Sequence, residues 1–80
     1  MQGVIKMLFF RCDGGIEDAI ETLKRRGLAL VERLGRRGNR DEWLIVQDFK
    51  FQQALVSLMT DDNQTVICVE RLVDPQGRLF

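Results

Sequence analysis

The chain has no histidine and no tyrosine among its 80 residues, and it has only two cysteines and one proline. Histidine is the commonest general base and the commonest transition-metal ligand, so its absence excludes histidine-based catalytic triads and most metal centres. Two cysteines that lack a Cys-x-x-Cys spacing are too few for a metal site built from thiolates alone. We therefore expect a non-enzymatic protein with no catalytic residues, no metal and no cofactor.

An excess of either charge is also lacking, because twelve basic and twelve acidic side chains give a net charge of zero. Dedicated nucleic-acid binders carry a basic excess, so this balance disfavours nucleic acid as the main partner. The apolar run at residues 4–10 contains Lys6 and is far too short to span a bilayer, and no small-residue cleavage site follows it. We therefore expect a cytoplasmic protein with free thiols and without a membrane partner.

The composition that remains is that of a small globular protein, with 45% hydrophobic and 30% charged residues. Its length predicts a single domain over residues 1–80, near the lower limit for a self-sufficient core. Residues 73–80 are expected to form a C-terminal turn and tail, because Pro75 follows Asp74 at a position that presets φ.

The first half of the chain predicts a strand, a helix and a hairpin. Residues 4–11 are rich in aromatic and β-branched types, which favour a strand. Apolar side chains then recur at helical spacing from Ile16 to Leu23, and Gly27 follows, which predicts a helix over residues 15–26. Residues 28–34 and 42–47 are predicted strands joined by a loop rich in glycine and asparagine.

The second half predicts a second helix and a last strand. Asp48 is a favourable N-cap, and the apolar residues after it recur at helical spacing: Phe51, Ala54, Leu55, Leu58 and Met59. Residues 61–63 are expected to end that helix, and residues 64–72 to form the fourth strand. The order β-α-β-β-α-β predicts an α+β, ferredoxin-like fold. Its four-stranded antiparallel sheet would have the order 4-1-3-2, with both helices on one face.

Two helices would cover one face of such a sheet and leave the other face to solvent. The predicted strands do not alternate cleanly between apolar and polar residues, so both faces of the central strands are apolar. Monomers rarely expose a large contiguous apolar patch, which predicts self-association as a homodimer or higher oligomer. The alternative is that the tail with Leu79 and Phe80 folds back over this face. The expected interface residues are Leu8, Phe10, Trp43, Ile45, Val66 and Cys68.

The stretch RCDGGIED, residues 11–18, joins the predicted first strand to the first helix. Gly14 and Gly15 permit close approach to the backbone, and the N–H groups of the following helix attract anions. Asp13 suits an ammonium group, so the loop as a whole suits a zwitterion such as an amino acid. The alternative is that Asp13 caps the helix and the glycines only turn the chain.

Residues 5–34 also resemble the first half of the ACT domain. After Gly14 there are apolar residues at Ile16, Ala19 and Leu23, and Gly27 precedes the second predicted strand. ACT domains are small βαββαβ regulatory modules that pair through sheets or edges and bind amino acids near the first loop. The family's proline is missing here, and Arg11 stands near the position of its usual acidic residue. The resemblance implies a ligand site at Arg11, Cys12, Asp13, Gly14, Gly15 and Ile16.

Seven of the twelve basic residues lie close together in the sequence, and only Glu32 offsets them. On the predicted fold they would form one basic patch of Lys24, Arg25, Arg26, Arg33, Arg36, Arg37 and Arg40. Such a patch suits RNA, DNA or an acidic protein, and the predicted topology is also that of the RNA-recognition motif. The alternative is a solvated helix end and hairpin tip.

These observations predict a small, ACT-like regulatory or ligand-sensing module that acts as a homo-oligomer and binds an amino acid or another small zwitterion or anion. One alternative function is a protein–protein interaction domain without a small-molecule ligand. A second alternative is a nucleic-acid-binding domain that uses the basic patch.

Overall fold

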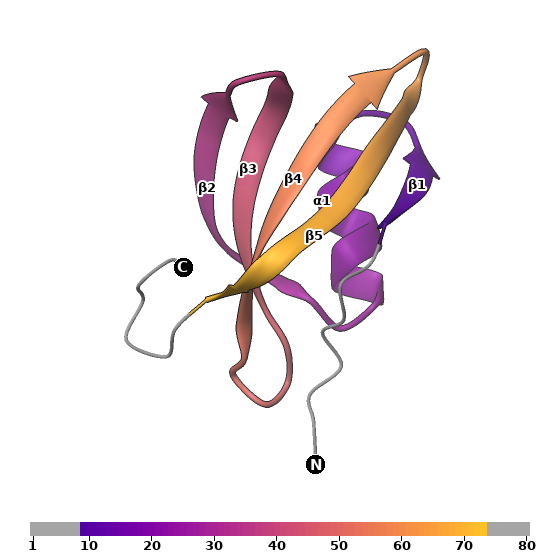
Figure 1. The fold of residues 1–80 in the computed structure, drawn as a ribbon. Helices are drawn as coiled ribbons and strands as arrows, with labels where there is room; N and C mark the ends of the chain where they lie inside the picture. Colours follow the sequence, from indigo (N-terminus) through magenta and orange to yellow (C-terminus); the bar gives the residue numbers. More distant parts are fainter. Residues whose placement is uncertain (1–8, 74–80) are drawn as a thin grey trace.

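The computed structural model describes residues 9–73, which form a five-stranded antiparallel sheet and one helix (Figure 1). In the sheet the strands have the order β1-β5-β4-β3-β2. The first strand therefore pairs with the last, and β1 and β2 form the two edges. Along the chain the elements are β1 (Phe9–Asp13), α1 (Ile16–Arg25), β2 (Ala29–Arg37), β3 (Arg40–Gln47), β4 (Gln53–Asp61) and β5 (Gln64–Val73).

The predicted first helix, the hairpin and the last strand are confirmed. α1 buries Ala19 and Leu23 on one face, and it carries acidic side chains in its first turn and basic ones in its last. These charges complement the helix dipole. Gly27, at φ 85°, takes the left-handed conformation just after the helix ends.

The ferredoxin-like fold with two helices is wrong. The segment predicted as the second helix forms β4, which pairs with β3 on one side and with β5 on the other. Ala54, Val56 and Leu58 belong to the core beside α1, while Leu55 packs in a second cluster on the opposite face. A strand buried on both faces is apolar almost throughout, so its residues matched a helical spacing by coincidence.

The predicted strand order 4-1-3-2 is also wrong. The segment that was predicted as the second helix is the central strand β4, and β1 lies at an edge of the sheet. The predicted pairing of the first strand with the last is present, with Phe9 opposite Cys68. Cys12 lies opposite Thr65, and both cysteines are free. Residues 4–8 of the predicted first strand and the turn and tail at 74–80 lie outside the described residues.

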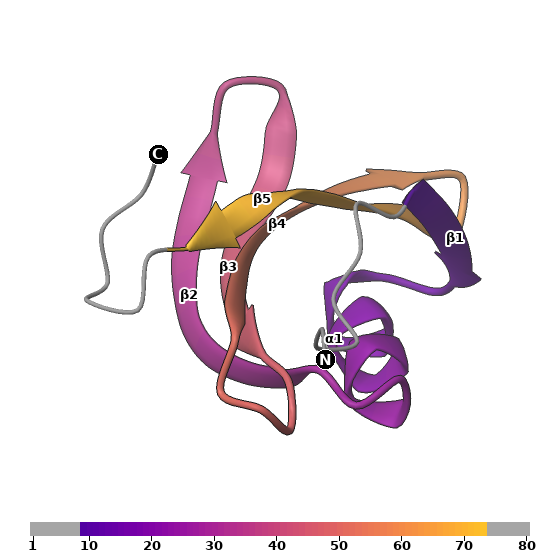
Figure 2. The same cartoon turned by 60° about the horizontal axis from the view of Figure 1, so that its bottom comes forward.

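The sheet curls around α1, which lies in its concave side (Figure 2). The main core fills this concavity with ten buried side chains: Ala19, Leu23, Leu28, Leu44, Val46, Ala54, Val56, Leu58, Ile67 and Val69. The convex face is the face opposite α1. It holds a smaller cluster in which Ile45, Leu55 and Val73 are buried and Trp43 packs against them. One helix is therefore enough for the concave face, and no helix within residues 9–73 lies on the convex face.

Candidate functional site

The loop predicted to bind a ligand joins β1 to α1, and internal hydrogen bonds occupy its backbone groups. The N–H of Gly14 donates to the carbonyl of Asn63 at 2.6 Å, and the Thr65 hydroxyl donates to the carbonyl of Gly14 at 2.8 Å. The N–H of Gly15 donates to Oδ2 of Asp18 at 3.0 Å. The expected cap at Asp13 is therefore wrong, because Asp18 accepts this bond while Asp13 accepts one from the Gln64 amide at 3.2 Å.

A groove of about 320 Å³ lies between this loop and the β4–β5 turn, lined by residues 14–15 and 60–64. Of the predicted ligand residues, Gly14 and Gly15 line the groove. Cys12 and Ile16 pack against the core instead, and Arg11 is exposed. Asp61 and Asp62 form part of the wall, so the groove favours an ammonium group over an anion. The sequence interpretation missed these two residues as site residues because it placed them at the end of a helix.

The predicted interface residues divide between the two faces of the sheet. Trp43 and Ile45 belong to the convex cluster, and Val66 and Cys68 alternate with the buried Ile67 of the concave core. Ile45 is only 7% exposed within the single chain. Leu8 lies outside the described residues.

Phe10 lies on the concave side and does not share a face with Trp43. It stands opposite Ile67 in the β1–β5 pair and packs against the core, with the Arg26 guanidinium 4.0 Å from the centre of its ring. The sequence analysis placed Phe10 on the same face as Cys68, whereas the structure pairs Cys68 with Phe9. A slip of one residue moves every side chain of a strand to the other face, which places Phe9 on the convex side.

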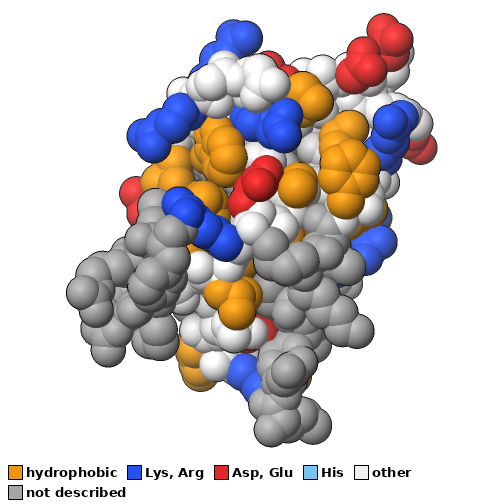
Figure 3. Space-filling view, in the orientation of Figure 1, with side chains coloured by type: hydrophobic (Ala, Val, Ile, Leu, Met, Phe, Trp, Pro, Cys, Tyr) orange, Lys and Arg blue, Asp and Glu red, His pale blue; other side chains and the backbone are white. Residues whose placement is uncertain are grey.

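One row of side chains crosses the convex face from edge to interior. Phe9 pairs with Cys68, Cys68 with Ser57, and Ser57 with Trp43. Phe9 is 68% exposed, Cys68 and Trp43 are half-buried, and the Trp43 indole donates to the carbonyl of Arg37 at 3.1 Å. On this side of the molecule hydrophobic side chains lie between basic and acidic ones (Figure 3). The face therefore combines apolar surface with both signs of charge.

Cys68 lies in this row, but its surroundings do not activate it. Burial raises the pKa of the Cys68 thiol above its ordinary value of 9.0, and a hydrogen bond with Glu70 raises it further. Glu70 also accepts a hydrogen bond from the Ser57 hydroxyl at 2.6 Å. The thiolate is the nucleophilic form of cysteine, so the neutral thiol that prevails here is a poor nucleophile.

The structure separates the predicted basic patch into two groups. Arg33 donates to Glu17 at 2.8 Å and to the buried Glu42 at 3.2 Å. The bond to Glu42 raises the pKa of Arg33 most, and the bond to Glu17 raises it further. Glu17 lies in the first turn of α1, so the β2–β3 hairpin is tied to the start of the helix. Lys24, Arg25 and Arg26 lie at the opposite end of that helix (Figure 1).

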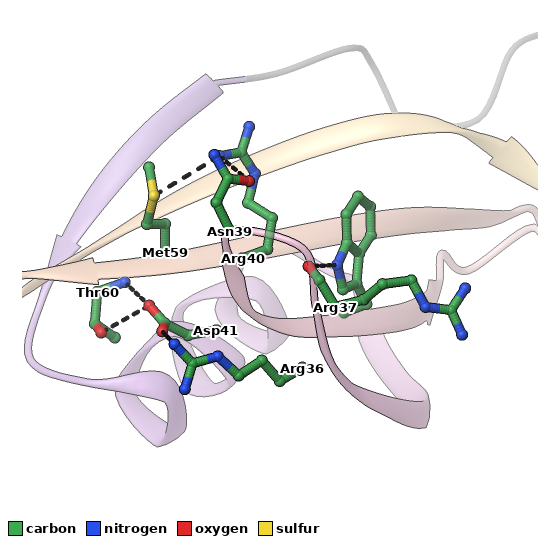
Figure 4. A network of polar contacts seen from close by, with 8 residues as sticks. Arg36, Arg37, Asn39, Arg40, Asp41, Met59 and Thr60 are labelled. Carbon is green, nitrogen blue, oxygen red and sulfur yellow. Dashed lines mark hydrogen bonds and ion pairs between the residues drawn. The ribbon is translucent and has the colours of Figure 1, made fainter.

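The hairpin group is held by a polar network around the tip of β2 and β3 (Figure 4). Asp41 accepts hydrogen bonds from the backbone N–H of Thr60 at 2.7 Å and from its hydroxyl at 2.9 Å, and these bonds lower the pKa of Asp41. Arg36 lies 4.0 Å from Asp41, and Arg40 donates to the sulfur of Met59 at 3.7 Å. The bonds of Arg40 and Asp41 join the hairpin to β4, so these two residues have a structural role.

Comparison with protein-family models, with curated proteins and with solved structures found no match. The βαββαβ order that the ACT resemblance implies is not the order of this chain. Within residues 9–73, no group of three or more histidine, cysteine, aspartate or glutamate side chains could hold a metal ion. No helix in the same part of the chain is long and apolar enough to cross a bilayer.

Proposed function

We propose that this chain is a non-enzymatic interaction module that self-associates through the convex face of its sheet. The observation that carries the proposal is the 68% exposure of Phe9, which lies beside the half-buried Cys68 and Val66 on a face that α1 does not cover. Burying a phenylalanine side chain contributes about 1.5–3 kcal/mol, so a partner that covers this face gains substantially from Phe9 alone.

A second copy of the chain is the partner that this face suits best. The charged side chains of the convex face have both signs, with Arg11 and Glu70 flanking the apolar row. A twofold axis brings the same patch of both copies together, so a basic group of one copy can lie opposite an acidic group of the other. The raised pKa of Cys68 supports the non-enzymatic part of the proposal, because this thiol is not prepared for catalysis.

The test is the molar mass in solution, measured by light scattering over a range of concentrations. We expect a dimer or higher oligomer for the natural chain and a monomer for Phe9→Lys. The matched control is Phe49→Lys, which changes a phenylalanine of similar exposure, 65%, outside the convex row and should leave the mass unchanged. A natural chain that stays monomeric at every concentration contradicts the proposal.

The groove beside Gly14 and Gly15 supports a second candidate function, the binding of a small ligand that carries an ammonium group, such as an amino acid. The acidic wall at Asp61 and Asp62 favours this class of ligand. Thermal-shift measurements with amino acids should raise the unfolding midpoint of the natural chain, and Asp62→Asn should abolish the shift. Asparagine tolerates the left-handed conformation of this position, so the turn itself is kept. No response to any amino acid contradicts this candidate.

A further inference from the structure

The turn between β3 and β4 is built on one buried aspartate. Asp48 is 4% exposed, and its Oδ1 accepts hydrogen bonds from the backbone N–H groups of Lys50 at 2.8 Å and Gln52 at 2.9 Å. The backbone of Asp48 adds two more bonds, one from its N–H to the carbonyl of Gln52 and one from the N–H of Phe51 to its carbonyl. These four bonds fix the conformation of the turn.

Phe51 occupies an unfavourable position in this turn. Its φ is 63°, in the left-handed region that glycine adopts without cost and that a bulky side chain rarely adopts. The bond between Asp48 and Gln52 closes a loop of three residues, 49–51. Such a loop ordinarily has glycine at the left-handed position. Phe51 is also 79% exposed, so packing within the chain does not offset the backbone strain. Strain of this kind is typical of functional positions, which suggests that the aromatic side chain is kept for an external contact.

The turn presents a second aromatic ring, and further apolar side chains lie near its base. Phe49 is 65% exposed, and the Lys50 ammonium lies 5.9 Å from the centre of its ring. Leu30 and Leu72 are 39% and 42% exposed, and they pair with residues of β3 and β4 close to the turn. The turn projects at one end of the sheet (Figures 1 and 2). This end of the molecule is therefore a projecting apolar tip.

Positive charge lies at the same end. Ala29 pairs with Gln47, which places the last turn of α1 near the start of the β3–β4 turn. Lys24 and Arg25 in that last turn are exposed, and neither forms an ion pair with another residue of the 9–73 segment. The molecule thus combines two exposed aromatic rings with exposed cations on one end, which we call the aromatic end: Lys24, Arg25, Phe49 and Phe51.

We propose that the aromatic end docks on the surface of an anionic phospholipid bilayer. Phe49 and Phe51 would enter the boundary between headgroups and acyl chains, and Lys24 and Arg25 would contact the anionic headgroups. Peripheral binding of this kind needs only a short apolar tip with nearby cations, so it requires no membrane-spanning segment. It revises the expectation, drawn from the short apolar runs, that the chain has no membrane partner. The position of Lys50 over the Phe49 ring disfavours the stacking of nucleic-acid bases at this tip.

Co-sedimentation of the full chain with vesicles tests the proposal. We expect binding to vesicles of phosphatidylcholine mixed with phosphatidylserine and much weaker binding to vesicles of phosphatidylcholine alone. Phe51→Gly should weaken binding about tenfold, because one buried aromatic ring is lost. Lys24→Gln and Arg25→Gln should each weaken binding to the mixed vesicles about fivefold. Phe51→Gly removes backbone strain, so a loss of binding in this variant does not come from unfolding.

Two matched controls lie near the other end of β2. Leu34→Ser removes an apolar side chain that is 39% exposed, and Arg37→Gln removes an exposed cation, and both should bind vesicles as the natural chain does. In the double variant Trp43→Phe, Phe49→Trp, the indole emission should shift to the blue on mixed vesicles. The proposal is overturned if the natural chain does not bind mixed vesicles, if Phe51→Gly binds them equally well, or if Phe51 instead proves necessary for binding a single-stranded oligonucleotide.

Discussion

Both turns at the ends of β4 contain left-handed backbone, but different types of residue adopt it in each turn. In the β4–β5 turn, Asp62 and Asn63 have φ values of 47° and 66°, and short polar side chains of this type tolerate the left-handed region. In the β3–β4 turn, Phe51 has φ 63°. The first turn also contacts the β1–α1 loop through Asn63, whereas Phe49 and Phe51 of the second are largely exposed. The residues of the first turn match its backbone, whereas Phe51 is strained and its side chain is largely exposed.

This contrast predicts that substitutions in the β1–α1 loop, which the β4–β5 turn contacts, destabilise the fold. Gly14→Ala should have the largest effect, because a Cβ atom at this position would clash with the Asp18 side chain and the backbone has φ 97°. We expect a loss of about 3 kcal/mol in the free energy of unfolding, measured in urea. Gly27→Ala is the control, since φ is 85° but no atom lies near, and it should cost only about 1 kcal/mol. Equal losses would show that the contact with Asp18 is unimportant.

Glu42→Gln should have the next largest effect. The buried Glu42 carboxylate accepts hydrogen bonds from Arg33 and from the backbone N–H of Gly35 at 2.8 Å, so it fixes the irregular pairing of β2. Hydrogen bonds to charged groups contribute about 1.5–3 kcal/mol, and we expect a loss of about 2 kcal/mol. Glu17→Gln removes the exposed partner of the same arginine and should change stability by less than about 0.5 kcal/mol. A larger loss for Glu17→Gln would contradict this assignment.

Substitutions at the left-handed positions of the two turns should produce effects of opposite sign. Asn63→Phe should cost about 1 kcal/mol, because it places a bulky residue in the left-handed region. Phe51→Gly should stabilise the fold by a similar amount, about 1 kcal/mol. Thermal and urea unfolding of both variants provide the measurement. Destabilisation by Phe51→Gly would show that the aromatic ring packs within the fold and would remove the contrast between the turns.

The smallest expected effect concerns the pH dependence of the hairpin tip. Hydrogen bonds from the N–H and hydroxyl of Thr60 lower the pKa of Asp41 below its ordinary value of 3.8. Because the pKa of Asp41 is lower in the folded state, the stabilisation that its carboxylate provides is fully present above the ordinary pKa. This stabilisation is lost as the pH falls through the lowered pKa of the folded state. The stability difference between the natural chain and Asp41→Asn should therefore shrink below pH 3.8. A difference that stays constant through the acid range would contradict this origin.

Local patterns predicted α1 and the β2–β3 hairpin because their signals depend on neighbours in the sequence. β4 could not be distinguished from a helix by its apolar spacing, since side chains on both of its faces are buried in hydrophobic clusters. The pair Asp62-Asn63 was a usable signal, because such residues favour a two-residue hairpin turn. Taken as a hairpin turn instead of a helix end, this pair predicts strands on both sides.

The candidate sites depended on contacts between distant segments. Gly14 and Gly15 are local signals, but Thr65, which donates to the Gly14 carbonyl, lies 51 positions away in the sequence. The face of Phe10 depended on the register in which β1 pairs with β5, which places Phe10 opposite Ile67. The exposure of Phe51 could not be predicted because its apolar type fitted the helix that was expected there.

The most direct test of this account measures unfolding and vesicle binding together in Phe51→Gly, beside the natural chain. We expect the variant to be more stable by about 1 kcal/mol and to bind phosphatidylserine-containing vesicles about tenfold more weakly. A variant that is less stable, or one that binds these vesicles as tightly as the natural chain, would contradict the claim that Phe51 is kept for contact rather than for the fold.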